Sequence, residues 1–180
     1  MLLTLRGTPF LYYGEELGMR DGEIPPERIC DPVGKRFAAL GRDPARAPMP
    51  WDASPHAGFS PAEPWLPLGD EWPAVNVAAQ RDDPASMLSF YRRVLWWRKS
   101  SPAVLDGSLR LLPGPEGTLV YAREGGGQRL IVALNFADRP ATVGLPESGR
   151  AVLSTGDLPT GQRTTLTLEP VQGAIVECGK

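Results

Sequence analysis

Short runs of β-forming residues fill the last part of the chain, with turn residues between them. Seven such runs follow in close succession, and they read GSLRLL, GTLVYARE, QRLIVALNFA, ATVGL, AVLST, TTLTLEP and GAIVECG. Their Val, Ile, Leu and Thr content suits strands, while the Gly, Pro, Asp and Glu between them favour turns. Strands at this spacing predict an antiparallel β-sandwich or barrel. Within it, Glu124–Gln128 (EGGGQ) predicts a hairpin between two of the clearest strands.

One helix is predicted immediately before this β-rich region. An aspartate pair suits the N-cap, Pro84 suits the first helical position, and the helix is expected to end near Ser100. Apolar side chains recur at helical spacing, at Met87, Phe90, Val94 and Trp97. The tryptophan pair 96–97 widens the apolar surface beyond one stripe, so this helix needs a large apolar partner surface.

The first eighty residues have a different character. The run Pro9–Tyr13 has the length of a buried strand and is closed by Gly14, and the leucines before Gly7 are typical of the last turn of a helix. A helix end, a turn and a strand in this order form the αβ step of a parallel α/β protein. A parallel strand needs neighbours and covering helices, so we expect this segment to belong to a larger domain. The Pro- and Gly-rich stretch after it predicts a long functional loop.

Composition argues against several classes of function. The 180 residues carry a formal net charge of −2 without long runs of one sign, so we expect neither nucleic acid nor membrane as a partner. No apolar stretch approaches the roughly 20 residues that span a bilayer. Cys30 and Cys178 lie in different regions and His56 is the only histidine, so we expect no disulfide, no metal site and a cytoplasmic location.

The adjacent acids Glu15 and Glu16 allow two interpretations. Two nearby carboxylates are the equipment of glycoside hydrolysis, but a strand end followed by an acidic helical turn contains the same pair. Adjacent side chains point to opposite sides of an extended segment and lie about 100° apart on a helix. Neither arrangement aims both carboxyl groups at one bond. We therefore predict that one acid lies in a first helical turn and the other in a structural hydrogen bond or ion pair.

Several stretches, taken in order, resemble the C-terminal part of α-glucosidases in the α-amylase-type glycoside hydrolase family, in particular the maltase and oligo-1,6-glucosidase group. They read RGTPFLYYGEELGM, GEIPPERICDP, RDPARAPMPWDASPHAGFS, EPWLPL and NVAAQRDDPASMLSFYRRVLWWRKSSPAVLDGSL. The resemblance extends over nearly the whole chain and is strongest up to Gly107. It implies an α/β plus all-β fold. Residues 1–102 would form the last βα unit and the long loop of a (β/α)8 TIM barrel, and residues 103–180 a C-terminal antiparallel β-sandwich.

Within that implied fold, Pro9–Gly14 would be the eighth barrel strand and the helix after Pro84 the eighth barrel helix. Active sites of such barrels lie at the C-terminal ends of the strands, so the loop 15–80 would face substrate. The resemblance implies a retaining hydrolase that releases terminal glucose from α-linked oligosaccharides (maltose- or isomaltose-like) without a cofactor. Its catalytic Asp, Glu and Asp follow the fourth, fifth and seventh strands, which we expect upstream of Met1. We therefore assign no catalytic residue here and expect the chain alone to be inactive.

Substrate contacts are expected in the segment Ala45–Asp52 (ARAPMPWD), which in the family walls the acceptor side of the sugar pocket. Family members read Arg-Thr-Pro-Met-Gln-Trp-Asp here, and this chain departs only at Ala47 and Pro50. An indole face stacks on sugar CH groups, and Arg and Asp bond hydroxyls. The expected substrate-binding residues are Arg46, Met49, Trp51, Asp52 and Phe59. The alternative is that Trp51 packs the loop onto the barrel and Arg46 pairs with an acid.

Two other interpretations stay open. Residues 103–180 are a candidate for a non-catalytic module that binds carbohydrate or protein, although this region contains no tryptophan. A truncated pseudo-enzyme would expose the apolar surface of 9–14 and of the helix, and would be poorly soluble. Linkage preference, sibling activities such as sucrose hydrolysis or trehalose-forming isomerisation, and oligomeric state are not set by these residues.

Overall fold

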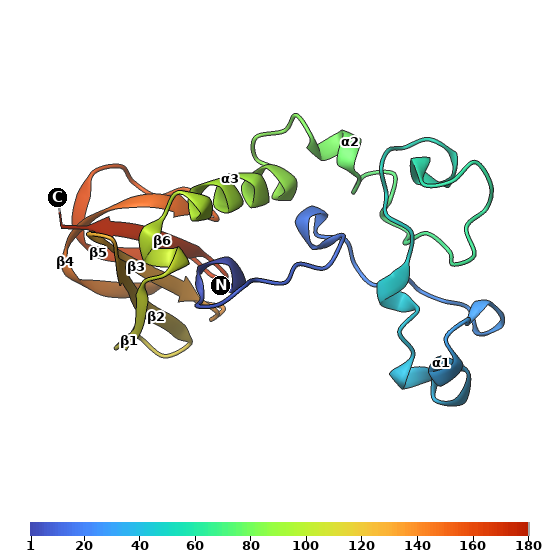
Figure 1. Ribbon diagram of the computed structural model, residues 1–180, viewed down its shortest axis with the longest axis horizontal. Helices are drawn as coiled ribbons and strands as arrows, with labels where there is room; N and C mark the ends of the chain where they lie inside the picture. Colours follow the sequence, from blue (N-terminus) through green and yellow to red (C-terminus); the bar gives the residue numbers. More distant parts are fainter. Residues whose placement is uncertain (180) are drawn as a thin grey trace. The chain divides into compact units, whose positions relative to one another are not determined.

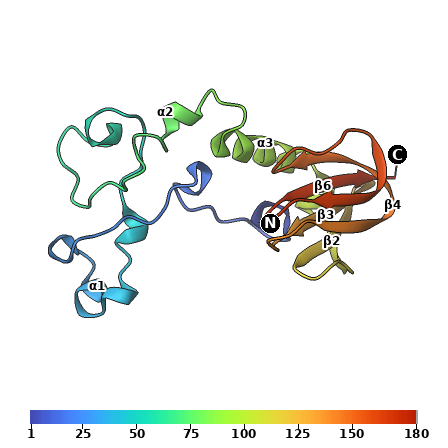
Figure 2. The same ribbon diagram turned by 180° about the vertical axis from the view of Figure 1, so that it is seen from behind.

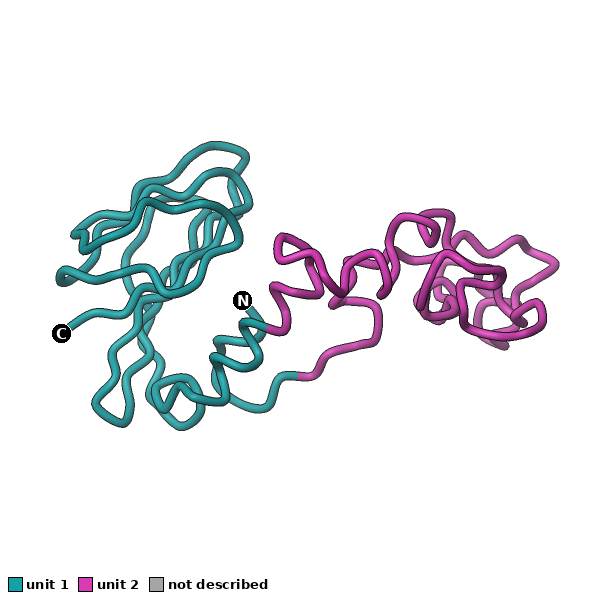
Figure 3. Tube along the Cα trace, turned by 90° about the horizontal axis from the view of Figure 1, so that it is seen from above, with its two compact units in different colours: residues 1–9, 93–180 teal, residues 10–92 magenta. Residues whose placement is uncertain are grey.

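The computed structural model describes residues 1–179, which divide into two compact units. One unit joins Met1–Pro9 to the chain from Arg93 onward, and the other comprises Phe10–Arg92, as the two colours of Figure 3 show. The helix that precedes the β-rich region therefore contributes to both units. The expected division between 102 and 103 stays a prediction.

Regular structure is concentrated in the first of these units. The helical elements are η1 (Leu2–Thr4), η2 (Glu15–Leu17), η3 (Pro26–Arg28), α1 (Pro32–Arg36), η4 (Ala38–Leu40), η5 (Pro44–Arg46), η6 (Pro55–Gly58), α2 (Val77–Gln80), α3 (Met87–Lys99) and α4 (Pro102–Leu105). The strands are β1 (Ser108–Leu112), β2 (Thr118–Gly125), β3 (Gln128–Asn135), β4 (Ala141–Ser154), β5 (Gln162–Leu168) and β6 (Gly173–Cys178). None of the helices within residues 1–179 has the length and hydropathy needed to cross a bilayer.

The six strands form one curved antiparallel sheet in the order β1-β2-β3-β6-β4-β5, seen from both sides in Figure 1 and Figure 2. This sheet confirms the predicted antiparallel β domain. The predicted hairpin is also confirmed, because Gly125 pairs with Gln128 across Gly126 and Gly127. Both of these turn glycines have positive φ, +58° and +76°, a conformation that most other residues reach only with strain.

The runs ATVGL and AVLST differ from the prediction, because they belong to one long strand. The first part of β4 pairs with β5, and its later part pairs with β6. Register irregularities at Gly144/Gly149 and at Ala151/Leu153 allow the strand to bend between these partners. At Gly149 an added Cβ would lie 2.6 Å from the side chain of Val176, so the absence of a side chain permits the close approach of β6.

The alternation of side chains along the strands produces two apolar clusters, because successive residues point to opposite faces. One cluster gathers residues from five strands: Val120, Ala122, Ile131, Ala133, Val143, Leu166, Leu168, Ala174, Val176 and Cys178. The other combines strand residues with α4, and consists of Ala103, Val104, Tyr121, Leu130, Val132 and Ile175. Leu5 and Trp97 pack against this second cluster, which places the N-terminal segment and the end of α3 on the sheet.

The predicted eighth barrel strand is not a strand in this structure. Residues 8–12 have no regular secondary structure, and Phe10 is 85% exposed. A strand of parallel type requires hydrogen-bonded neighbours, and residues 1–179 supply none at this position. The expected helix end before Gly7 is present as the single turn η1, and Gly7 has a φ of +94°.

The start of the long helix was predicted too early. α3 begins at Met87, three residues after Pro84, because the capping hydroxyl belongs to Ser86, which accepts a hydrogen bond from the N–H of Ser89 at 3.1 Å. The carboxylate of Asp83 instead accepts from the N–H of Ala85 at 2.8 Å, and this bond closes a turn ahead of the helix. The end at Lys99 agrees with the prediction.

The expected long loop is confirmed in the unit Phe10–Arg92, whose helical elements before α3 are single short turns. Two buried carboxylates organise part of this loop. Oδ2 of Asp43 accepts from the backbone N–H groups of Cys30 and Asp31, each at 2.7 Å. The side chain of Asp31 accepts in turn from the N–H and the guanidinium of Arg42.

Candidate functional site

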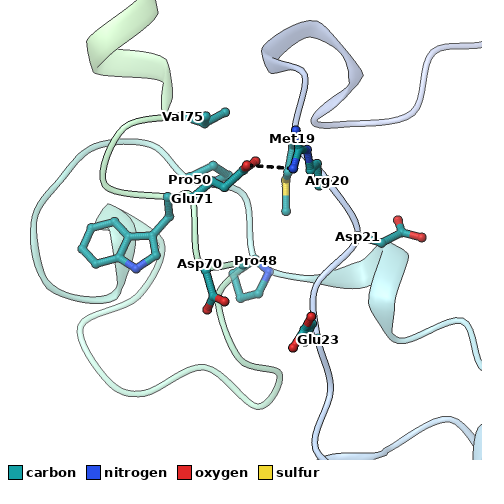
Figure 4. Close-up of a pocket in the computed structure, with 11 residues that line it drawn as sticks. Met19, Arg20, Asp21, Glu23, Pro48, Pro50, Asp70, Glu71 and Val75 are labelled. Carbon is teal, nitrogen blue, oxygen red and sulfur yellow. Dashed lines mark ion pairs between the residues drawn. The ribbon is translucent and has the colours of Figure 1, made fainter.

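A pocket of about 240 Å³ opens in the loop unit. Three segments build it, and the lining residues are Met19, Arg20, Asp21, Glu23, Pro48, Pro50, Gly69, Asp70, Glu71, Trp72 and Val75. Figure 4 shows Asp21 and Glu23 on one segment and Asp70 and Glu71 on another, with Pro48 and Pro50 from the third. Glu23, Asp70 and Glu71 thus bring acids from two loops to one concave surface, while the carboxylate of Asp21 points away from it.

Backbone hydrogen bonds fix the three segments relative to one another. The N–H of Gly22 donates to the carbonyl of Pro44 at 2.9 Å, which ties the first segment to η5, just before the segment of Pro48 and Pro50. The N–H of Val77 donates to the carbonyl of Pro50 at 3.0 Å, which ties the third segment to the second. The hydroxyl of Tyr13 donates to the carbonyl of Ala47 at 2.9 Å. These bonds give the pocket a defined shape although its walls are loops.

Asn76 positions the tryptophan segment of the wall. Its side chain is 1% exposed, and Oδ1 accepts from the N–H of Ala79 at 2.8 Å as the N-cap of α2. Its Nδ2 donates to the carbonyls of Trp72 at 3.0 Å and Pro73 at 3.1 Å. One buried amide thus accepts a hydrogen bond from the start of α2 and donates two hydrogen bonds to carbonyls at the end of the pocket segment.

The pocket is electronegative. Four acidic residues and one arginine give the lining residues a formal charge of −3. One ion pair crosses it, from Nη1 of Arg20 to Oε1 of Glu71 at 3.2 Å. The two side chains are 81% and 45% exposed, so water screens the pair and it contributes little to stability. The pocket is therefore suited to neutral or cationic groups.

The lining offers hydrogen-bond acceptors, one guanidinium and one indole, but no nucleophile paired with a base. Carboxylates and Arg form hydrogen bonds with hydroxyl groups, and an indole stacks on apolar faces. Within residues 1–179, no three side chains of the His, Cys, Asp and Glu types lie close enough to share a metal ion. The lining can therefore form hydrogen bonds and cover an apolar face, but it holds no catalytic pair.

The five residues expected to bind substrate lie near this pocket in sequence but do not line it. Met49 is buried between Pro48 and Pro50, which do line it. Arg46 ends η5 and is half-buried, while Trp51 and Phe59 are 49% and 45% exposed. Their role in substrate binding stays a prediction.

Asp52, the remaining member of that set, is engaged in a turn. Its carboxylate accepts from the N–H of Ser54 at 2.8 Å and from the Ser54 hydroxyl, and these bonds lower the pKa of Asp52. An added Cβ at Gly58, whose φ is +64°, would lie 2.7 Å from Oδ2 of Asp52. The loop thus closes tightly around this carboxylate.

The structural role predicted for the paired acids is confirmed. Glu15 and Glu16 lie in the first turn of η2, and Oε2 of Glu16 accepts from the N–H of Gly14 at 2.8 Å. Both acids, after burial itself, raise the pKa of Tyr91. Both cysteines are free thiols, and burial raises the pKa of the Cys178 thiol.

Sequence reasoning missed the acidic wall of the pocket. The segments MRDGE (19–23) and GDEW (69–72) each place two carboxylates beside a glycine, and the second adds a tryptophan. Acids and an aromatic in a Gly-rich loop are a detectable signal for hydroxyl recognition. Only the folded loop shows that the two segments, about fifty residues apart in the chain, face one pocket.

An antiparallel β domain follows a long loop and its helix, which is the order expected for the end of a barrel domain and a C-terminal β domain. The family comparison agrees: residues 1–107 match the alpha-amylase catalytic domain, and residues 106–173 match a domain of unknown function, DUF3459. The chain belongs to the alpha-amylase family. The resemblance and the fold class drawn from the sequence are thereby confirmed.

Individual relatives agree with this assignment. A probable alpha-glucosidase of Rhizobium meliloti (strain 1021) is 39% identical over 148 residues, which cover 81% of this chain and 27% of that protein. A probable oligo-1,6-glucosidase 3 of Bacillus subtilis (strain 168) is 32% identical over 196 residues, which cover 95% of this chain and 35% of that protein. The chain thus spans about a third of the length of these curated relatives.

Solved structures match over nearly the whole chain. The alpha-glucosyl transfer enzyme XgtA is 35% identical with a TM-score of 0.87, and the match covers 99% of this chain and 34% of that one. The trehalulose synthase MutB from Pseudomonas mesoacidophila MX-45 is 28% identical with a TM-score of 0.88, covering 99% and 37%. A mutant of MutB has been solved with its substrate sucrose.

Proposed function

We propose that this chain is the C-terminal part of a retaining α-glucosidase, which hydrolyses terminal α-linked glucose from oligosaccharides. The observation that carries the proposal is the 39% identity with a probable alpha-glucosidase across 81% of the chain. The oligo-1,6-glucosidase relatives support an oligosaccharide substrate. We further propose a cytoplasmic enzyme that uses no redox cofactor, in keeping with its two free cysteines.

In this proposal the chain supplies substrate contacts and the catalytic carboxylates lie elsewhere in the enzyme. Retaining hydrolysis needs a nucleophile and an acid about 5 Å apart, and Glu15 and Glu16 are committed to their own turn. The pocket carboxylates would accept hydrogen bonds from sugar hydroxyls, and Trp72 would cover an apolar sugar face. The formal charge of −3 would disfavour anionic sugars.

A second candidate function is glucosyl transfer to a sugar acceptor. The similarity to XgtA, at 35% identity, and to MutB favours it. Retaining enzymes of both kinds pass through a covalent glucosyl-enzyme, which either water or a sugar hydroxyl then attacks. A surface that holds an acceptor sugar would shift that competition toward transfer, so the two functions differ in how the acceptor side binds.

The native polypeptide that contains this chain provides the test. An antibody raised against residues 1–180 isolates it from the source cell, and intact mass spectrometry gives its size. It is then assayed on maltose, isomaltose and sucrose, with proton NMR following the anomer that is released first. We expect hydrolysis with α-glucose as the first product. Disaccharide products in place of free glucose would favour transfer. β-Glucose first, or no turnover of the three sugars, would overturn the proposal.

A further inference from the structure

Two arginines in the β unit are buried without an acidic partner. Arg123 on β2 is 0% exposed and Arg98 on α3 is 8% exposed. Neither forms an ion pair with any carboxylate of residues 1–179. A buried charge without compensation is costly, so both guanidinium groups need strong hydrogen-bond acceptors.

Backbone carbonyls are the acceptors of Arg123. Its Nη1 donates to the carbonyl of Thr4 at 2.6 Å, and its Nη2 donates to the carbonyls of Val104 at 2.8 Å and Gly107 at 3.2 Å. Its Nε donates to the carbonyl of Ser108 at 3.0 Å. One side chain of the sheet therefore joins the N-terminal segment, the end of α4 and the start of β1.

Arg98 holds the same N-terminal segment from the helix side. Its Nη1 donates to the carbonyl of Leu3 at 2.7 Å, and its Nη2 donates to the carbonyl of Gly7 at 2.9 Å. The hydroxyls of Thr4 and Tyr121 lie 2.6 Å apart and share a further buried hydrogen bond. Three side chains from α3 and β2 thus hold both ends and the middle of Leu3–Gly7.

The carbonyls of Leu3 and Thr4 are the kind that a helix end leaves unsatisfied. The turn η1 ends at Thr4, and carbonyls at a helix C-terminus lack partners and carry partial negative charge. Guanidinium groups suit them because each presents several donors in a fixed plane. Burial and the nearby charge of Arg98 both lower the pKa of Arg123. Both cations donate to carbonyls of the same N-terminal segment.

We propose that Arg98 and Arg123 form a carbonyl clamp through which the β domain, together with the end of α3, fixes residues Leu3–Gly7. The clamp holds the segment that directly precedes the loop unit, which begins at Phe10. Both arginines are positioning residues in this proposal. The inference gives a physical role to the region that matches a domain of unknown function, and it does not depend on the identity of the substrate.

Amide hydrogen exchange of the full 180-residue chain tests the clamp, with Arg123→Met and Arg98→Met compared with wild type. We expect a peptide covering residues 1–12 to exchange about tenfold faster or more in each variant, because the segment opens more readily once the guanidinium donors to its carbonyls are lost. Peptides from β3 and β6 should stay within about twofold of wild type. The double variant should add little to either single one, because both arginines hold one segment.

The matched control is Arg110→Met, which removes a cation from the exposed face of β1, where the side chain is 64% exposed. It should leave peptide 1–12 unchanged. Arg98→Lys tests geometry, because one ammonium cannot span the two carbonyls and should restore protection only in part. If Arg123→Met does not fold, the two Arg98 variants decide. Unchanged exchange of 1–12 in them, or equal loss of protection throughout the sheet, would overturn the proposal.

Discussion

The carboxylate of Asp31 and the guanidinium of Arg42 form a two-point ion pair in the loop unit. Nε of Arg42 donates to Oδ2 at 2.9 Å and its Nη2 donates to Oδ1 at 2.5 Å, while its backbone N–H also reaches Oδ2 at 2.9 Å. The Asp31 side chain is fully buried, and that of Arg42 is 57% exposed. The hydrogen bonds from Arg42 hold the pKa of Asp31 well below its ordinary value.

The first prediction concerns acid and this pair. A folded-state pKa below the unfolded value means that ionised Asp31 stabilises the fold above about pH 4, and that this stability is lost as the pH falls toward the folded pKa. Asp31→Asn should therefore lower the melting temperature at pH 7 by a few degrees, and by less at pH 3. Calorimetry at both pH values measures this. The exposed pair Arg28–Glu63 gives the control, since Glu63→Gln should change little. An equal loss at both pH values would contradict the argument.

The second prediction concerns Asn76. Asn76→Ala removes the N-cap of α2 and both donors to the pocket segment, and should cost about 1–3 kcal/mol of unfolding free energy. Asn76→Ser keeps a capping acceptor, lacks the amide donors and buries no charge, so its cost should be smaller. Urea denaturation followed by tryptophan fluorescence measures both. Equal losses for the two variants would show that the cap contributes nothing.

The third prediction concerns Gly58, which closes the turn around Asp52. Gly58→Ala places a Cβ 2.7 Å from the carboxylate in a backbone with φ of +64°, and should cost about 1–3 kcal/mol. Gly69→Ala is the matched control, because an added Cβ there meets nothing within 4 Å and the backbone is ordinary. Thermal unfolding of both variants is the measurement. Similar melting temperatures for the two would contradict the predicted clash.

Sequence patterns predicted the strands and the hairpin of the β unit well, because the signals for a strand or a turn lie within a few neighbouring residues. Alternation along β2 and β3, and the glycines at 126–127, decide strand and turn within a few residues. The same reasoning was wrong for 9–14, where a strand depends on neighbours that no local pattern supplies. It also placed the start of α3 at Pro84, because it did not weigh the hydroxyl of Ser86 as an alternative cap.

The candidate site was predictable only in part for a similar reason. The motif around Trp51 includes Pro48 and Pro50, which line the pocket, but the five residues predicted to bind substrate do not line it. The carboxylates opposite them come from segments about fifty residues apart, and their approach depends on bonds such as that of Gly22 to Pro44. Spacing along the chain carries no information about such long-range closure.

The fourth prediction is that the isolated 180-residue chain does not hydrolyse a chromogenic α-glucoside. The carboxylate of Glu16 accepts from Gly14, and that of Asp52 is held by Ser54, so neither is free to act as a nucleophile beside an acid. The measurement is nitrophenol release at high protein concentration. Activity that copurifies with the chain and disappears in Arg46→Ala would contradict it.

The last prediction separates the observed pocket from the predicted loop as the substrate contact, and rests on the proposed function. In the native polypeptide, Trp72→Ala should raise KM for maltose about tenfold, or about 1.4 kcal/mol of binding, with kcat within twofold, because it removes an apolar contact from ground and transition states alike. Trp65→Ala is the control, since this side chain is 59% exposed and lies outside the pocket lining. An unchanged KM in Trp72→Ala, together with a raised KM in Trp51→Ala, would assign recognition to the predicted loop instead.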